Sequence, residues 1–202
     1  LLIPTGAAGG SPRLVETAAD PPFPIQQRVE VTGKITDLGK LDARVRYVLR
    51  GDSELLLRSA FRRTPQADWK KLAQLLAYAD GFRAEVTEVS VSDPAATQQP
   101  FEVLFKISQA NYLDWSKKRS ELPLPMPRMN LPQVGEEDDP GPDAEPIQLG
   151  SPAEALAAVQ LEVPSTFSTR APVAVNITRD YADYRSHYSA AGQTIKAERV
   201  LR

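Results

Sequence analysis

From Gly51 to Gly81 the sequence reads GDSELLLRSAFRRTPQADWKKLAQLLAYADG, the one long stretch with a helical pattern. Thr64 and Pro65 are typical of a helix start, because a hydroxyl caps free N–H groups and a first-turn proline loses no helical hydrogen bond. Apolar residues then recur every three or four positions until Gly81, a typical left-handed helix end. The sequence therefore predicts an amphipathic helix, whose apolar face holds Trp69, Leu72, Ala73, Leu76 and Ala79.

A shorter helix is predicted immediately upstream. Asp52 or Ser53 can cap its first turn. The residues expected to share its buried flank are Leu55, Leu56, Ser59, Ala60 and Phe61. We expect the two helices, at about 52–80, to lie as a pair on a layer of β-strands.

Segments on both sides of this helical pair alternate apolar and polar residues, as strands with one buried face do. Between Val29 and Leu49 the alternation predicts an antiparallel hairpin. Further strands are expected at 84–91, 101–108, 158–163, 173–177, 184–189 and 194–201. We predict an α+β fold dominated by β-structure, with antiparallel, sandwich-like sheets and the helical pair inserted between strands.

The chain divides by composition into four regions. We interpret residues 1–28 as a lead-in or edge strand, and 29–128 as the antiparallel sheet with its two helices. Residues 129–146 are rich in acidic residues, proline and glycine, which is typical of a solvated linker or loop rather than a calcium site. Residues 147–202 form hairpins that either complete the sheet or make a small second β-domain.

Composition excludes several functions. The 24 basic and 26 acidic residues leave a net charge of −2, so nucleic acid is not an expected partner. No apolar run is long enough to cross a bilayer, and we expect no membrane insertion by this segment. Cysteine is absent, which excludes a thiol nucleophile and a zinc site with sulfur ligands. Since no glycine-rich phosphate loop is present either, we expect no catalytic, cofactor-binding or metal-binding residues.

His187 is the only histidine. It stands in a segment that alternates like a strand, and we interpret it as an ordinary strand residue rather than a general base.

Aromatic side chains offer a different hypothesis, because such rings stack on sugars and anchor interfaces. The candidate ligand surface consists of Tyr112, Trp115, Tyr181, Tyr184 and Tyr188.

Several short motifs carry a family resemblance. They are TGKITDLGKLDARVRYVLRGDSELLLRSAF at 32–61, SDP at 92–94, PFEVLFKISQANYLDW at 100–115, PLP at 123–125, PIQLGSP at 146–152, Tyr184, and GQTIKAERVL at 192–201. In their order these elements resemble the β-rich region that follows the papain-type catalytic core of large bacterial transglutaminase-like proteins. The resemblance extends from about Val29 to the end of the chain.

Activity in that family requires a cysteine, a histidine and an aspartate, and this chain has no cysteine. The resemblance therefore implies a non-catalytic accessory domain, which acts as a scaffold or interaction module for an upstream core in the same polypeptide. The parent protein would be a cysteine enzyme or an inactive relative, in the periplasm or at the cell surface. An envelope protein or a glycan is a further expected partner.

The alternative function is a carbohydrate- or protein-binding β-module that uses the aromatic surface. An independent enzyme that uses Asp180, Asp183 and His187 ranks third.

Overall fold

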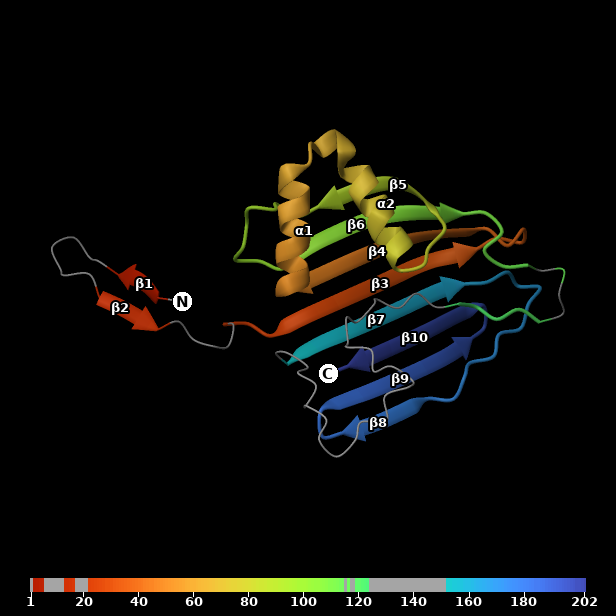
Figure 1. The fold of residues 1–202 in the computed structure, drawn as a ribbon. Helices are drawn as coiled ribbons and strands as arrows, with labels where there is room; N and C mark the ends of the chain where they lie inside the picture. Colours follow the sequence, from red (N-terminus) through yellow and green to blue (C-terminus); the bar gives the residue numbers. More distant parts are fainter. Residues whose placement is uncertain (1, 6–12, 17–21, 115, 117–118, 124–151) are drawn as a thin grey trace, which may run out of the picture.

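The computed structural model describes residues 2–5, 13–16, 22–114, 116, 119–123 and 152–202. Within these ranges an eight-stranded sheet carries two helices on one face (Figure 1). A separate antiparallel ribbon is formed by β1 (Leu2–Thr5) and β2 (Arg13–Glu16). The predicted fold class, α+β and dominated by β-structure, is confirmed. Trp115 and the predicted acidic linker at 129–146 lie outside the described residues.

The first half of the chain supplies four strands of the sheet and both helices. In chain order these are β3 (Ile25–Ile35), β4 (Leu41–Arg50), α1 (Asp52–Arg63), a 3₁₀ turn at Gln66–Asp68, α2 (Trp69–Ala79), β5 (Glu85–Val91) and β6 (Phe101–Gln109). The second half adds β7 (Ala153–Glu162), β8 (Val175–Arg179), β9 (Ala182–Ala191) and β10 (Thr194–Leu201). Across the sheet the strand order is β5-β6-β4-β3-β7-β10-β9-β8.

One strand pair makes the sheet mixed. β7 runs parallel to β3, with Val29 opposite Ala157, while the other neighbouring strands are antiparallel. The strands therefore form one mixed sheet, where we expected sandwich-like antiparallel sheets. The physical reason is the long connection from β6 to β7. A long crossover lets the chain return parallel to an earlier strand, here β3, whereas a short hairpin makes the next strand antiparallel. Strands from 153–202 thus share a sheet with those from 25–109, and the division into domains stays a prediction.

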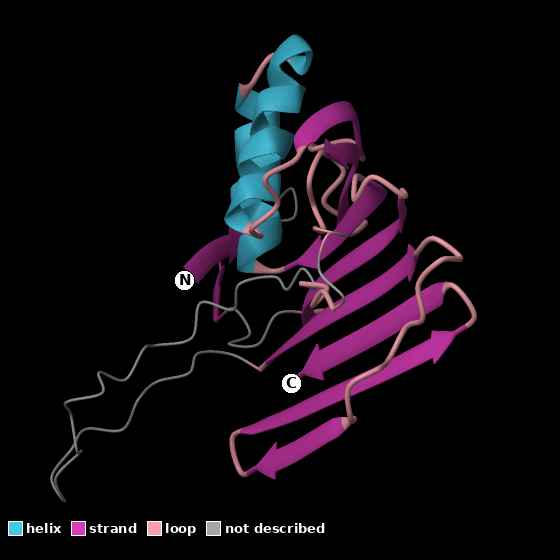
Figure 2. Ribbon diagram, turned by 90° about the vertical axis from the view of Figure 1, so that its right-hand side faces the viewer, coloured by secondary structure: helices cyan, strands magenta, loops and turns pink. Residues whose placement is uncertain are grey.

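The two faces of the sheet differ in what covers them. Odd-numbered residues of β3, β4, β6, β7 and β10 and even-numbered residues of β9 point to the side where the helices pack, which we call the helix face. The opposite side is the open face. Figure 2 shows the helices standing against one end of the sheet. The largest fully buried side chains include Tyr47, Phe61, Phe101, Phe105, Leu41, Leu49 and Leu161.

The inner side of α1 differs from the expected one. Leu55 and Leu56 are 70% and 71% exposed, so their placement on the buried flank was wrong. The buried residues of this helix are Glu54, Arg58 and Phe61. They follow one another at spacings of four and three, so they form a continuous stripe toward the sheet. An ion pair between Glu54 and Arg58 thus lies on the buried side of α1, where we expected leucines.

The second helix packs as expected, apart from its last residue. Ala73 and Ala77 are buried, and Trp69, Leu72 and Leu76 pack against the core, whereas Ala79 is exposed. The Trp69 indole N–H donates to the carbonyl oxygens of Phe61 and Thr64, each at 3.1 Å. These bonds join the start of α2 to the end of α1.

The end of α2 is tied to the sheet by Tyr47, whose hydroxyl donates to the Asp80 carboxylate. Burial, together with the nearby Asp80 charge, raises the pKa of Tyr47 far above its ordinary value. The last residue of α2 is Ala79, and Gly81, two residues further on, has the expected left-handed conformation with φ 85°.

Candidate interaction surface

The motif residues of α1 meet the loop between β5 and β6. The Arg58 guanidinium lies 2.9 Å from a Glu54 carboxylate oxygen, and both side chains are at most 7% exposed. Arg58 also donates to the carbonyl oxygens of Asp93, at 2.9 Å, and Gln99, at 2.5 Å. Its guanidinium lies 4.9 Å from the centre of the Phe101 ring. Arg58 therefore holds α1, the loop and β6 together.

A second arginine holds the same loop. Arg50 donates to the carbonyl oxygens of Thr97 and Gln98 at 3.0 and 2.6 Å. It also pairs with Glu54 at 3.3 Å, so this one carboxylate joins both arginines. Between strand and helix stands Gly51, with φ 95°, where an added Cβ would lie 2.8 Å from Ile25. These motif residues make internal contacts, and we assign them a structural role.

On the open face, charged side chains of β3, β4 and β6 form an ion-pair network. Arg46 lies 3.0 Å from Glu30 and 2.8 Å from Glu102. Arg28 also pairs with Glu30, at 2.7 Å. Further ion pairs join Lys106 to Glu88 and Lys40 to Asp42, each at 2.8 Å. This network stabilises the strand pairing and engages many of the charges that the strands present to solvent.

The Glu30 ion pairs give the protein a pH-dependent stability. Burial raises the pKa of Glu30, but hydrogen bonds from Arg46 and Arg28 and their charges outweigh burial and leave the pKa below its ordinary value of 4.5. Because the folded-state pKa is the lower one, this stabilisation is present above about pH 4.5 and is lost as the pH falls through the folded value.

We expect Glu30→Gln to lower the free energy of unfolding by about 0.5–1 kcal/mol at pH 7, and by less at pH 3. Urea denaturation at both pH values measures the difference. The control is Glu162→Gln, which alters an exposed residue at the end of β7. An equal loss at both pH values would contradict the assigned role of Glu30.

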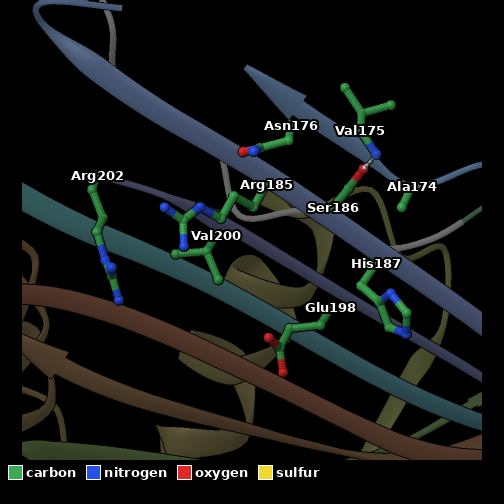
Figure 3. Close-up of a pocket in the computed structure, with 9 residues that line it drawn as sticks. All are labelled: Ala174, Val175, Asn176, Arg185, Ser186, His187, Glu198, Val200 and Arg202. Carbon is green, nitrogen blue, oxygen red and sulfur yellow. Dashed lines mark hydrogen bonds between the residues drawn. The ribbon is translucent and has the colours of Figure 1, made fainter. Parts of the chain in front are cut away.

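Strands β3, β7, β10, β9 and β8 line a hollow on the open face. It consists of two adjoining depressions of about 390 and 600 Å³, which share His187 and Glu198. In Figure 3 the side chains of Arg185, His187 and Glu198 extend from β9 and β10 over the first depression. His187 and Glu198 are direct neighbours across the strand pair. The remaining polar lining of the two depressions comes from Asn176, Ser186, Arg202, Glu30, Thr32, Gln160, Ser189 and Lys196.

The charged side chains of this hollow are largely unengaged. In the described part of the chain, Arg185, His187, Lys196 and Glu198 make no side-chain hydrogen bond or ion pair. The other two charged residues of the lining are engaged: Arg202 pairs with Glu154 at 2.5 Å, and Glu30 pairs with Arg28 and Arg46. Cationic and anionic groups thus lie side by side in a concave surface without internal partners. Such a surface suits a polar partner that carries charges of both signs.

The predicted aromatic residues lie on separate segments. Tyr112 follows β6, is half-buried, and donates its hydroxyl to the Pro123 carbonyl at 2.6 Å. Burial raises the pKa of Tyr112 to about 12. Tyr181 is 70% exposed at the turn between β8 and β9. Tyr184 and Tyr188 are half-buried on the helix face of β9.

Tyr188 is engaged by a neighbouring strand. Arg199 donates to the Tyr188 hydroxyl at 2.9 Å, and its guanidinium lies 5.6 Å from the ring centre. Burial raises the pKa of Tyr188, but the hydrogen bonds with Ser186 and Arg199 outweigh burial and leave the pKa below its ordinary value. The four described rings therefore do not form one exposed surface. A ligand surface built from all five predicted rings stays a prediction.

Sequence reasoning missed Arg185 and Glu198, and interpreted His187 as an ordinary strand residue rather than a general base. The alternation in YADYRSHYS already puts Arg185 and His187 on one face of a strand. Glu198 could not be added from sequence, because its position opposite His187 depends on the register between β9 and β10.

The described ranges lack two structural features. They contain no group of three or more histidine, aspartate or glutamate residues arranged to hold a metal ion. None of the helices in this part of the chain is long and apolar enough to cross a membrane.

The chain was also compared with models of protein families, with curated proteins and with solved structures, and none of them matches it. Its class is therefore defined by its fold, an α+β protein built on one mixed β-sheet with a helical pair on one face.

Proposed function

We propose that this chain is a non-catalytic accessory domain of a bacterial transglutaminase-like protein. In this proposal it acts as a scaffold and interaction module for the catalytic core of the same polypeptide, in the periplasm or at the cell surface. The observation that carries the interaction role is the hollow on the open face, where Arg185, His187 and Glu198 have no partner among the described side chains.

Electrostatic complementarity explains how such a hollow would select its partner. Charges that face a matching surface steer association and exclude partners with like charges. A wrong partner would leave Arg185 or Glu198 desolvated without a counter-charge, which is costly. The mixed signs in the hollow therefore favour a protein surface over a uniformly charged polymer.

The scaffold role is supported by what the motif residues do. Arg58 contacts Glu54 in the same helix and the carbonyl oxygen of Asp93 in the SDP motif. The residues that carry the family resemblance thus hold a helix against a loop. This is consistent with a domain that provides shape to a larger protein.

The interaction role is tested by isothermal titration calorimetry of this chain against the separately produced core that precedes it in the parent polypeptide. We expect Arg185→Glu to weaken binding about tenfold, equivalent to roughly 1.4 kcal/mol. The matched control is Arg44→Glu, which reverses an exposed charge on the open face outside the hollow. Absence of binding, or equal losses for both variants, would exclude the hollow as the docking surface.

The non-catalytic assignment is tested separately. The purified chain should neither hydrolyse a glutamine-containing peptide nor transfer its acyl group to an amine, because it contains no thiol nucleophile. Measurable turnover by the purified chain would overturn this part of the proposal.

A further inference from the structure

The two edges of the eight-stranded sheet differ in how they are protected. The edge strand β5 has a register irregularity between Val86 and Val89, and α2 packs against it. It also carries Glu85 and Glu88, which pair with Lys70 and Lys106. Irregular pairing, charged side chains and a covering helix all prevent another strand from adding to an edge.

The opposite edge strand, β8, has neither irregular pairing nor a covering helix among the described elements. Its residues, Val175–Arg179, are all exposed, and β8 pairs with β9 alone among the described strands. It contains no proline or glycine, its pairing with β9 is regular, and Arg179 at its end is its single charged residue. A regular edge of this kind presents free backbone N–H and C=O groups to a further strand.

Apolar side chains accompany this free edge. Val175 and Ile177 point to the same face of β8 and are 43% and 42% exposed. Val173, immediately before the strand, is 85% exposed, and Tyr181, just after it, is 70% exposed. A partner strand at this edge would bury apolar surface as well as satisfy backbone groups.

We propose that β8 pairs antiparallel with β8 of a second copy of this chain, so that two sheets join edge to edge about a two-fold axis. Full overlap of the two strands places Ile177 opposite Ile177 and Val175 opposite Arg179. The two Arg179 residues then lie at opposite ends of the pairing, so no like charges face each other. β8 is thus complementary to itself, as a two-fold interface requires.

The length of the strand limits the strength of this association. Five paired residues on each side form a small contact, and small interfaces belong to weak or transient complexes. The dimer should therefore form at high protein concentration and dissociate on dilution. Val175 and Asn176 of β8 also line the first depression, so the edge adjoins the hollow. The inference does not depend on the proposed function, because the pairing is argued and tested with this chain alone.

The absence of cysteine permits a direct test in the full chain. In Ile177→Cys the only thiol lies at the centre of the proposed pairing. Directly opposed residues of antiparallel strands have Cα atoms about 4.5–5.5 Å apart, within the range for a disulfide. Mild oxidation should therefore yield a covalent dimer at least about fivefold faster than it does for the control variant Leu38→Cys. Leu38 lies on a turn and is 87% exposed, so a thiol at this position is accessible but outside the proposed pairing.

Sedimentation equilibrium provides the second readout. The unmodified chain should show a concentration-dependent dimer, and Ile177→Lys should weaken it at least about tenfold, because it places a charge on the edge. Leu55→Lys changes a more exposed apolar residue on α1, 70% exposed against 42% for Ile177, and should leave the dimer unchanged. Circular dichroism confirms that both variants are folded. A monomer at every concentration, or equal oxidation rates for the two cysteine variants, would overturn the proposal.

Discussion

Replacing Arg58 with methionine is expected to lower the free energy of unfolding by about 3–5 kcal/mol, because removal of one partner leaves a buried charge poorly compensated. The Glu54 carboxylate would keep Arg50 at 3.3 Å and the Gly51 N–H at 3.3 Å, but lose its 2.9 Å contact with Arg58. The carbonyl oxygens that Arg58 engages would lose a donor as well. Urea denaturation measures the change.

The matched control for this variant is Arg62→Met, which removes an exposed arginine from the same helix. It should change stability by less than about 0.5 kcal/mol. In Arg58→Met the amides of the 92–100 loop should also exchange faster with solvent, because two of the bonds holding this loop are lost. A loss below 1 kcal/mol, with unchanged exchange in the loop, would contradict the role we give to Arg58.

Truncating Phe61 to alanine is expected to cost about 3–5 kcal/mol as well, through the loss of buried apolar surface and the cavity left behind. Phe61 is 1% exposed, and its ring centre lies 5.7 Å from those of both Trp69 and Phe101. It therefore joins α1, α2 and β6 in one cluster. Thermal and urea denaturation should both report the loss.

The control for Phe61→Ala is Leu55→Ala, on the same helix but 70% exposed, which should cost less than about 1 kcal/mol. This pair of variants also decides which side of α1 faces the core. Equal losses for the two variants would contradict the orientation described above.

Much of the local structure could be predicted from the sequence. Alternation along β3 and β4, the helical spacing in α2, and the helix end at Gly81 all reflect interactions between residues near one another in the chain. The side of α1 that faces the core could not be predicted by the same means. Hydrophobic periodicity gave no sign that Glu54 and Arg58 would be buried, because their burial depends on each other and on carbonyl groups of a distant loop.

The candidate site shows the same limit. The alternating pattern around His187 places Arg185 beside it, but Glu198 joins them through strand pairing. The contrast between the free edge at β8 and the protected edge at β5 likewise depends on strand order, which no local pattern specifies.

By itself, then, the sequence determined the identity of the helices and strands and the absence of a thiol, because backbone preference and side-chain alternation act over a few residues. The tertiary structure alone decided that β7 returns parallel to β3, that Arg58 joins a helix to a loop, and that Arg185 and Glu198 share a hollow. These features arise from contacts between residues far apart in the chain. Their geometry depends on the path of the whole chain.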